Sequence, residues 1–242
     1  MRGIITVFLS LVMFTVLIIA LVLGYLGFIP GLSSFFKADK PQDLGITYTD
    51  ADWQSALQKT EVQLTDLPSD TPPQESIQFK GQKDVKANFT DEELTALANN
   101  SHWIYYPFSN VQIKIDKNGI AEISGIIFCE LVSNYAQASN YSEGDLMRFL
   151  AQFQLIKAHP PFYLKGTGTV INGRLNFEIE KIKVGKFSFP SNLKAQSKKE
   201  LVGFSEFLFQ NISGFSVDFA RLNGSQLKFQ GTLPEEEARA VE

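Results

Sequence analysis

The uncharged, strongly apolar segment from Ile4 to Ile29 limits what the sequence can fold into more than any other feature. It holds 26 residues rich in Leu, Ile, Val and Phe. An α-helix of that length, with a rise of ~1.5 Å per residue, is about 39 Å long, whereas the hydrocarbon core of a bilayer is only ~30 Å thick. Ser10, Thr15 and Tyr25 do not form the polar stripe of a helix that rests on a soluble core. The segment therefore predicts a single membrane span.

A cleavable signal peptide is the alternative for this segment, and it would need a shorter apolar core followed by a small-x-small site. The sequence from Gly24 to Pro30 is a poor cleavage site, and no cysteine after the span is placed for lipidation. We therefore expect an uncleaved signal anchor. Arg2 before the span and three charged residues after it nearly balance the positive-inside count. The expected topology is a short inner N-terminus, with residues 38–242 on the extracytoplasmic side of the cell membrane.

Shifts in composition divide the chain into four predicted parts. These are a membrane anchor over 1–36, a short helix and Pro-rich linker over 37–76, an α+β domain over 77–233, and a charged tail over 234–242. The linker includes the segment from Asp66 to Ser76, which contains three prolines. The tail is expected to fray.

Charge and composition narrow the classes of function. A net charge of −4 and a pI of 5.4 exclude the basic surface that nucleic-acid binding requires. The 21 Phe residues are the compositional oddity, and they fit either a Phe-rich core or a cavity for an apolar ligand. Cys129 is the single cysteine, so it has no partner for an internal disulfide, and its apolar surroundings indicate a buried structural thiol.

Four helix starts are marked by a hydroxyl residue, an acid three positions later and an apolar residue after that. The hydroxyl caps the first turn and the acid closes a capping box. The copies begin at Thr49, Thr90, Ser142 and Ser197, which predicts helices starting near residues 50, 91, 143 and 198. The acids of the first two copies also suggest calcium ligands, but helix capping explains all four copies together.

The last two predicted helices carry more bulky apolar side chains than one face of a sheet requires. Either the sheet curls far enough to enclose them, or part of them lines a groove open to a lipid chain. The predicted candidate apolar groove consists of Leu146, Phe149, Leu150, Phe153, Phe204, Phe207 and Leu208.

Between the helices the apolar period changes from helical spacing to two. Val111, Ile113 and Ile115 alternate with polar residues, as strands with one wet face do. Asn-Gly pairs at residues 118, 172 and 223 each lie between two strand-like runs and predict antiparallel hairpins over about 110–127, 162–183 and 215–231. Gly166 and Gly168 indicate a bend or bulge, and residues 77–79 an edge strand.

A family resemblance covers most of residues 43–231. The segments that carry it are Asp43–Trp53, Phe89–Leu97, Leu164–Gly173 and Lys183–Pro190. They resemble uncharacterised bacterial membrane-anchored envelope proteins and, more loosely, LmeA-like phospholipid-binding proteins and the tubular lipid-binding superfamily. The resemblance implies a curved antiparallel sheet wrapped around a long helix, and it implies lipid binding.

Motifs for catalysis or metal binding are not found in the sequence. His102 and His159 lack the closely spaced partners of a zinc or acid-base site, and there is no G-x-S-x-G and no phosphate loop. We expect no catalytic residue, no cofactor and no metal.

The sequence thus predicts an α+β domain, a curved antiparallel sheet packed with about four helices, tethered by an N-terminal transmembrane helix. Its expected function is non-catalytic binding of a lipid or other apolar envelope molecule, with the membrane, a lipid or an envelope protein as partner. The alternative is a structural component of the envelope that docks another protein and has a fully packed core. An enzyme ranks third.

Overall fold

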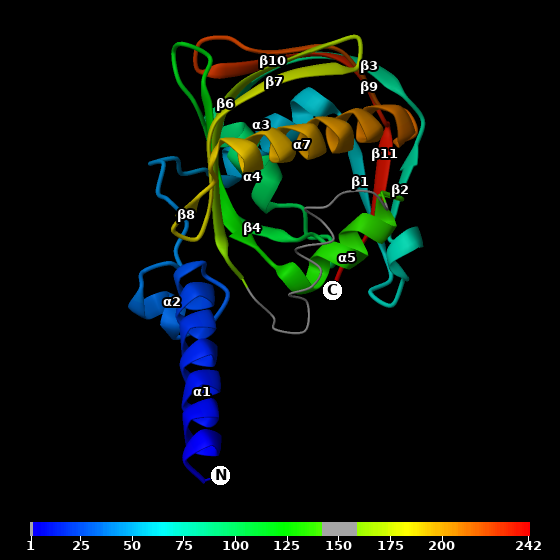
Figure 1. Ribbon diagram of the computed structural model, residues 1–242. Helices are drawn as coiled ribbons and strands as arrows, with labels where there is room; N and C mark the ends of the chain where they lie inside the picture. Colours follow the sequence, from blue (N-terminus) through cyan, green and yellow to red (C-terminus); the bar gives the residue numbers. More distant parts are fainter. Residues whose placement is uncertain (1, 142–158) are drawn as a thin grey trace.

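The computed structural model describes residues 2–141 and 159–242, with side chains from residue 12 onward. A strongly curled antiparallel sheet surrounds one long helix, and the N-terminal helix projects away from the domain (Figure 1). Six α-helices lie in the described residues: α1 (Arg2–Tyr25), α2 (Leu32–Phe35), α3 (Asp50–Thr60), α4 (Asp91–Asn99), α5 (Cys129–Ala138) and α7 (Ser191–Asn211). The predicted α+β class with a curved antiparallel sheet is confirmed.

The large sheet has eight strands and divides at β6. Its order is β3 (Lys83–Thr90), β10 (Gln226–Leu233), β9 (Ser216–Leu222), β6 (Pro161–Ile171), β5 (Ala121–Ile127) and β4 (Phe108–Ile115), with β7 (Arg174–Val184) and β8 (Phe187–Ser188) beside β6. β7 pairs with β6 along one edge, while the other edge pairs first with β5 and then with β9. The two arms diverge after Gly166, and together they curl around α7 (Figure 1).

All three predicted hairpins are confirmed, between β4 and β5, β6 and β7, and β9 and β10. In the second, Asn172 and Gly173 have φ values of 50° and 70°, the positive values that a type I′ turn requires. The predicted bulge also occurs, because the register of β6 shifts between Lys165 and Gly166. A Cβ at Gly166 would collide with the carbonyl oxygen of Glu178, so glycine is required there.

A second sheet corrects two expectations. It has the order β1 (Gln63–Leu67), β11 (Glu236–Ala240) and β2 (Ile77–Lys80), and β11 runs parallel to β1. The prediction that the tail frays is wrong, because β11 is the central strand and Ala240 is fully buried. The linker from Asp66 to Ser76 is also more ordered than predicted: Asp66 pairs with Arg239 in the sheet, and buried Ser76 accepts a hydrogen bond from Trp103. The predicted edge strand at residues 77–79 is confirmed as β2.

Two of the four predicted helix starts are confirmed with complete capping boxes, Thr49 with Asp52 and Thr90 with Glu93. The third, at Ser142, lies outside the described residues. The fourth is wrong, since α7 begins at Ser191, directly after Pro190, and Ser197 is buried within the helix. Nothing in residues 191–196 opposes a helix, so the chain turns helical as soon as the proline has fixed the entry.

Three polar side chains of α4 seal the exposed edge of β4. Asp91, Thr95 and Asn99 lie four residues apart, on one face of the helix. They accept hydrogen bonds from the backbone N–H groups of Ile115, Ile113 and Val111 at 3.0, 3.0 and 2.9 Å. Because β4 is an edge strand, these bonds replace the ladder that another strand would supply. We call this set the α4 ladder.

The end of α1 is built into the domain. Gly27 has a φ of 89°, its N–H donates to Gly24, and the N–H of Phe28 donates to Leu23, which together make a Schellman motif. Phe28 is buried against Cys129 and its neighbours. The helix therefore ends at Tyr25, before the predicted limit of Ile29. Among the described residues, no helix has both the length and the apolar character needed to cross a membrane. The membrane span stays a prediction.

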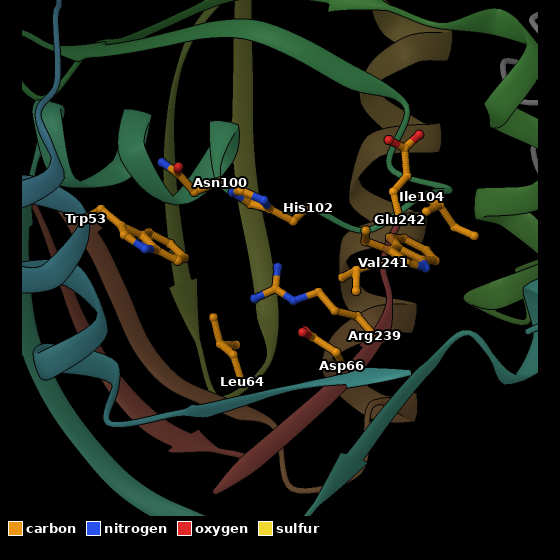
Figure 2. Close-up of a pocket in the computed structure, with 10 residues that line it drawn as sticks. Trp53, Leu64, Asp66, Asn100, His102, Ile104, Arg239, Val241 and Glu242 are labelled. Atoms are coloured by element: carbon orange, nitrogen blue, oxygen red, sulfur yellow. The ribbon is translucent and has the colours of Figure 1, made fainter. Parts of the chain in front are cut away.

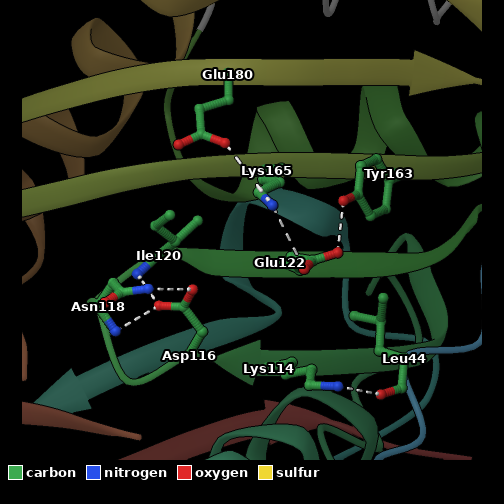
Figure 3. A network of polar contacts seen from close by, with 9 residues as sticks. All are labelled: Leu44, Lys114, Asp116, Asn118, Ile120, Glu122, Tyr163, Lys165 and Glu180. Carbon is green, nitrogen blue, oxygen red and sulfur yellow. Dashed lines mark hydrogen bonds and ion pairs between the residues drawn. The ribbon is translucent and has the colours of Figure 1, made fainter. Parts of the chain in front are cut away.

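The segment after α2 is held against the outer strands. The N–H of Leu44 donates to the Gln112 side chain at 2.6 Å, and Lys114 donates to the Leu44 carbonyl at 3.2 Å. Next to it, Tyr163 donates to Glu122, and Lys165 lies 3.8 Å from the carboxylates of Glu122 and Glu180 (Figure 3). The connector between the N-terminal helices and α3 is thus fixed along β4.

Candidate functional site

An apolar cavity of about 360 Å³ lies between α3, the small sheet and the end of α7. Its lining is mostly aliphatic and aromatic, which is the composition of sites for apolar ligands. The lining residues include Leu57, Val62, Phe79, Leu97, Tyr106, Ile212, Phe215 and Leu233. We call it the apolar cavity.

A second cavity, of about 720 Å³, adjoins the first and has a polar lining. Its walls come from β1, β11, α3 and the loop that follows α4 (Figure 2). That loop is fixed to β11 because the N–H of Ile104 donates to Ala240 at 3.0 Å. The residues that bring polar groups to it are Asp66, Asn100, His102, Trp103, Arg239 and Glu242. We call it the polar cavity.

Three residues line both cavities: Trp53, Leu64 and Arg239. In Figure 2 the guanidinium group of Arg239 extends into the space between Trp53 and His102. Trp53 comes from α3, Leu64 from β1 and Arg239 from β11. The two cavities therefore meet at this junction, where an apolar space continues into one lined by hydrogen-bonding groups.

Arg239 is held in place from two sides. Its Nε lies 3.7 Å from a carboxylate oxygen of Glu237, and its guanidinium donates to the carbonyl oxygen of Ser101. Burial raises the pKa of Glu237, and the charge of Arg239 offsets part of that rise. The Arg239 side chain is only 7% exposed, so its charge carries a desolvation cost. The contacts with Glu237 and Ser101 offset that cost. A rigid, mostly buried cation is thus placed at the junction.

A smaller cavity of about 280 Å³ lies under the curled sheet, against α7. It is lined by Leu201 and Ser205 of α7 and by apolar residues of the sheet, including Phe177 and Leu227. We call it the α7 cavity.

Of the predicted groove residues, Leu146, Phe149, Leu150 and Phe153 lie outside the described residues. Leu208 is half-buried on α7. The ring centroid of Phe204 lies 4.9 Å from that of Tyr141 and 6.1 Å from that of Tyr135. The ring centroid of Phe207 lies 5.1 Å from that of Tyr141. These two phenylalanines therefore contribute to an aromatic cluster, whereas Leu201 and Ser205 line the α7 cavity. The proposed groove stays a prediction.

The junction could not be located from the sequence. Arg239 lies in a segment that reads as a charged tail, and Trp53 reads as an ordinary core residue of an amphipathic helix. The only hint was the alternation of Ala238 and Ala240 with charged residues, which is too short to define a strand.

The acids that suggested calcium have structural partners instead. Asp52 and Glu93 close capping boxes, and Glu93 also binds Lys59 at 2.6 Å. In the described part of the chain, no three His, Cys, Asp or Glu side chains are grouped as metal ligands are. Cys129 is buried as predicted, and burial, followed by the charge of Glu130, raises the pKa of its thiol to about 12.

Comparisons with protein-family models, with curated proteins and with solved structures found no match to this chain.

Proposed function

We propose that this protein binds a lipid or a similar amphipathic molecule without catalysing a reaction. The observation that carries the proposal is the junction at Trp53, Leu64 and Arg239, where an apolar cavity meets a polar one. Both volumes fall within the ~300–1,000 Å³ typical of ligand sites. An apolar chain would occupy the first cavity, and the polar part of the same molecule would occupy the second.

The polar cavity suits a head group with several hydrogen-bonding atoms. Asn100 and His102 supply donors and acceptors, and Asp66 adds a carboxylate. Arg239 is already paired with Glu237, so the pair contributes hydrogen bonds more than net charge. A neutral or zwitterionic head group therefore fits better than a strongly anionic one.

We further propose that α1 anchors the domain in a membrane, with the domain on the extracytoplasmic side. From Val12 onward the helix exposes large apolar side chains, among them Met13 at 73% and Phe14 at 60%. Apolar surface of this kind on a projecting helix requires a partner, and a bilayer is the one that the uncharged segment fits. Protease added to intact cells should digest residues 38–242. Protection of the domain, or a mature N-terminus after residue 24, would contradict the anchor.

The ligand proposal is tested by filling the junction. The full chain, extracted in detergent, is examined by native mass spectrometry for bound lipid. Uptake of a fluorescent lysophosphatidylcholine from vesicles is then measured, because this lipid has a single apolar chain and a zwitterionic head group. Leu64→Trp places a larger ring between the two cavities and should reduce uptake by an order of magnitude or more. Thr65→Trp is the matched control, because its side chain points to the other face of the same strand and is exposed.

The two variants separate the outcomes. Lost uptake in Leu64→Trp with normal uptake in Thr65→Trp supports the site. Equal uptake in both variants overturns it. If the folded wild-type chain carries no lipid and takes none up, lipid binding is wrong and the envelope interaction protein becomes the leading function.

A further inference from the structure

We propose that α2 and the turn between β7 and β8 form a collar that lies in the membrane interface around the end of α1. The collar is defined as Phe35, Phe36, Phe187, Lys37, Lys40 and Lys186. The inference rests on the proposed anchoring of α1, and it adds that the base of the domain itself contacts lipid in a fixed orientation.

The first argument is that the two parts of the collar are built against α1. A Cβ at Gly185 would collide with the carbonyl oxygen of Leu26, so the turn lies directly on the end of the helix. The N–H of Lys186 donates to the carbonyl of Tyr25 at 3.3 Å. A Cβ at Gly24 would lie 2.6 Å from that of Leu32, the first residue of α2. Both parts therefore pack directly against the end of α1.

The second argument is the exposure of large aromatic rings at this level. Phe35 is 80% exposed, although it is the last residue of a helix that buries Ser33. Phe187 is 39% exposed. Phe36 links Phe35 to α1, because its ring makes edge contacts with Phe35 at 5.3 Å and with Tyr25 at 6.1 Å. Aromatic rings of this kind gather where a membrane protein passes from the lipid core to water.

The third argument is charge. Lys37, Lys40 and Lys186 are all exposed, and Lys37 and Lys186 are chain neighbours of Phe36 and Phe187. Asp39 is the acid among them, and its carboxylate accepts a hydrogen bond from Ser34 at 2.5 Å. Three cations against one anion favour a surface of anionic head groups, although the whole chain has a net charge of −4. The occupant that fits both rings and charges is the anionic surface of the bilayer that α1 enters.

The test uses spin labels on the full chain in vesicles of three parts phosphatidylcholine to one part phosphatidylglycerol. A cysteine replaces Phe35, Phe187, Phe14 or Tyr48, one in each variant. Buried Cys129 should not react with the spin label, and labelling of the unsubstituted chain checks this. Accessibility of each label to oxygen and to a water-soluble nickel chelate gives its depth. Tyr48 is the control, since it is an exposed aromatic that directly precedes the N-cap of α3, and α3 lies far from α1 in Figure 1.

The labels at 35 and 187 should lie at the level of the head groups, the label at 14 deep in the bilayer, and the label at 48 in water. If 14 is deep while 35 and 187 are as accessible to nickel as 48, the collar is wrong but the anchor stands. If 14 is also in water, the anchor fails and the collar with it. If the labels at 35 and 187 are shielded and also show spin coupling between copies, a second copy of the chain covers the collar in place of lipid. That result would overturn the proposal. As a further check, Lys37→Glu with Lys186→Glu should make the label at 35 shallower.

Discussion

The α4 ladder makes the stability of this protein depend on one buried carboxylate. Asp91 is 8% exposed and accepts the N–H of Ile115. Burial raises its pKa from 3.8 to about 6, and the hydrogen bond from Ile115 opposes only part of that rise. One pKa unit corresponds to about 1.4 kcal/mol, so the full effect is about 3 kcal/mol, and solvent near the helix start reduces it to about 1–2 kcal/mol.

The sign follows from linkage. Because the folded state holds the proton more tightly than the unfolded state, the contribution of Asp91 is complete below its ordinary pKa of 3.8 and is lost as the pH rises through about 6. Asp91→Asn keeps an acceptor for Ile115 but cannot ionise. Relative to wild type, it should therefore gain about 1–2 kcal/mol between about pH 4 and about pH 7.

The assay is urea unfolding of the full chain in detergent, followed by the fluorescence of buried Trp103. The other titrating groups cancel in the difference between the variant and wild type. Asp91→Ala is the control: it should show the same pH dependence but be about 1–2 kcal/mol less stable throughout, since it leaves the N–H of Ile115 unpaired. A difference between Asp91→Asn and wild type that does not change with pH would refute this reasoning.

Three other substitutions test single features of the fold by the same unfolding assay. Thr95→Val keeps the shape of the side chain but removes the acceptor for Ile113, and it should cost about 1–2 kcal/mol; no loss would mean that water replaces the hydroxyl. Gly173→Val should cost about 1–2 kcal/mol through backbone strain alone, since φ is 70° and a Cβ there meets no other atom within 4 Å; an unchanged midpoint would contradict the turn geometry. Ala240→Glu should cost more than about 3 kcal/mol by burying a charge in β11, whereas a frayed tail would tolerate it.

Features set by neighbours along the chain were predictable from the sequence. Asn172-Gly173 has the residue types that tolerate positive φ, and that requirement is the same in any fold. Thr49 and Thr90 cap helices through bonds that reach three residues, so their patterns are sufficient evidence for the helix starts. The predicted start of α7 at Ser197 is wrong because a capping pattern is also compatible with the interior of a helix.

Features set by contacts between distant segments were decided only by the tertiary structure. Gln63 pairs with Glu236, and no local pattern records that partner, so β11 read as a tail and the cavities that it lines were not foreseen. The polar stripe of Asp91, Thr95 and Asn99 reads as a solvent face, yet its partners are backbone groups of an edge strand, which carry no sequence signature. The chain by itself determines its turns, its caps and its apolar segments. Only folding determines which of them meet, because hydrogen bonds and cavities between distant strands depend on their relative placement and not on the residues beside them.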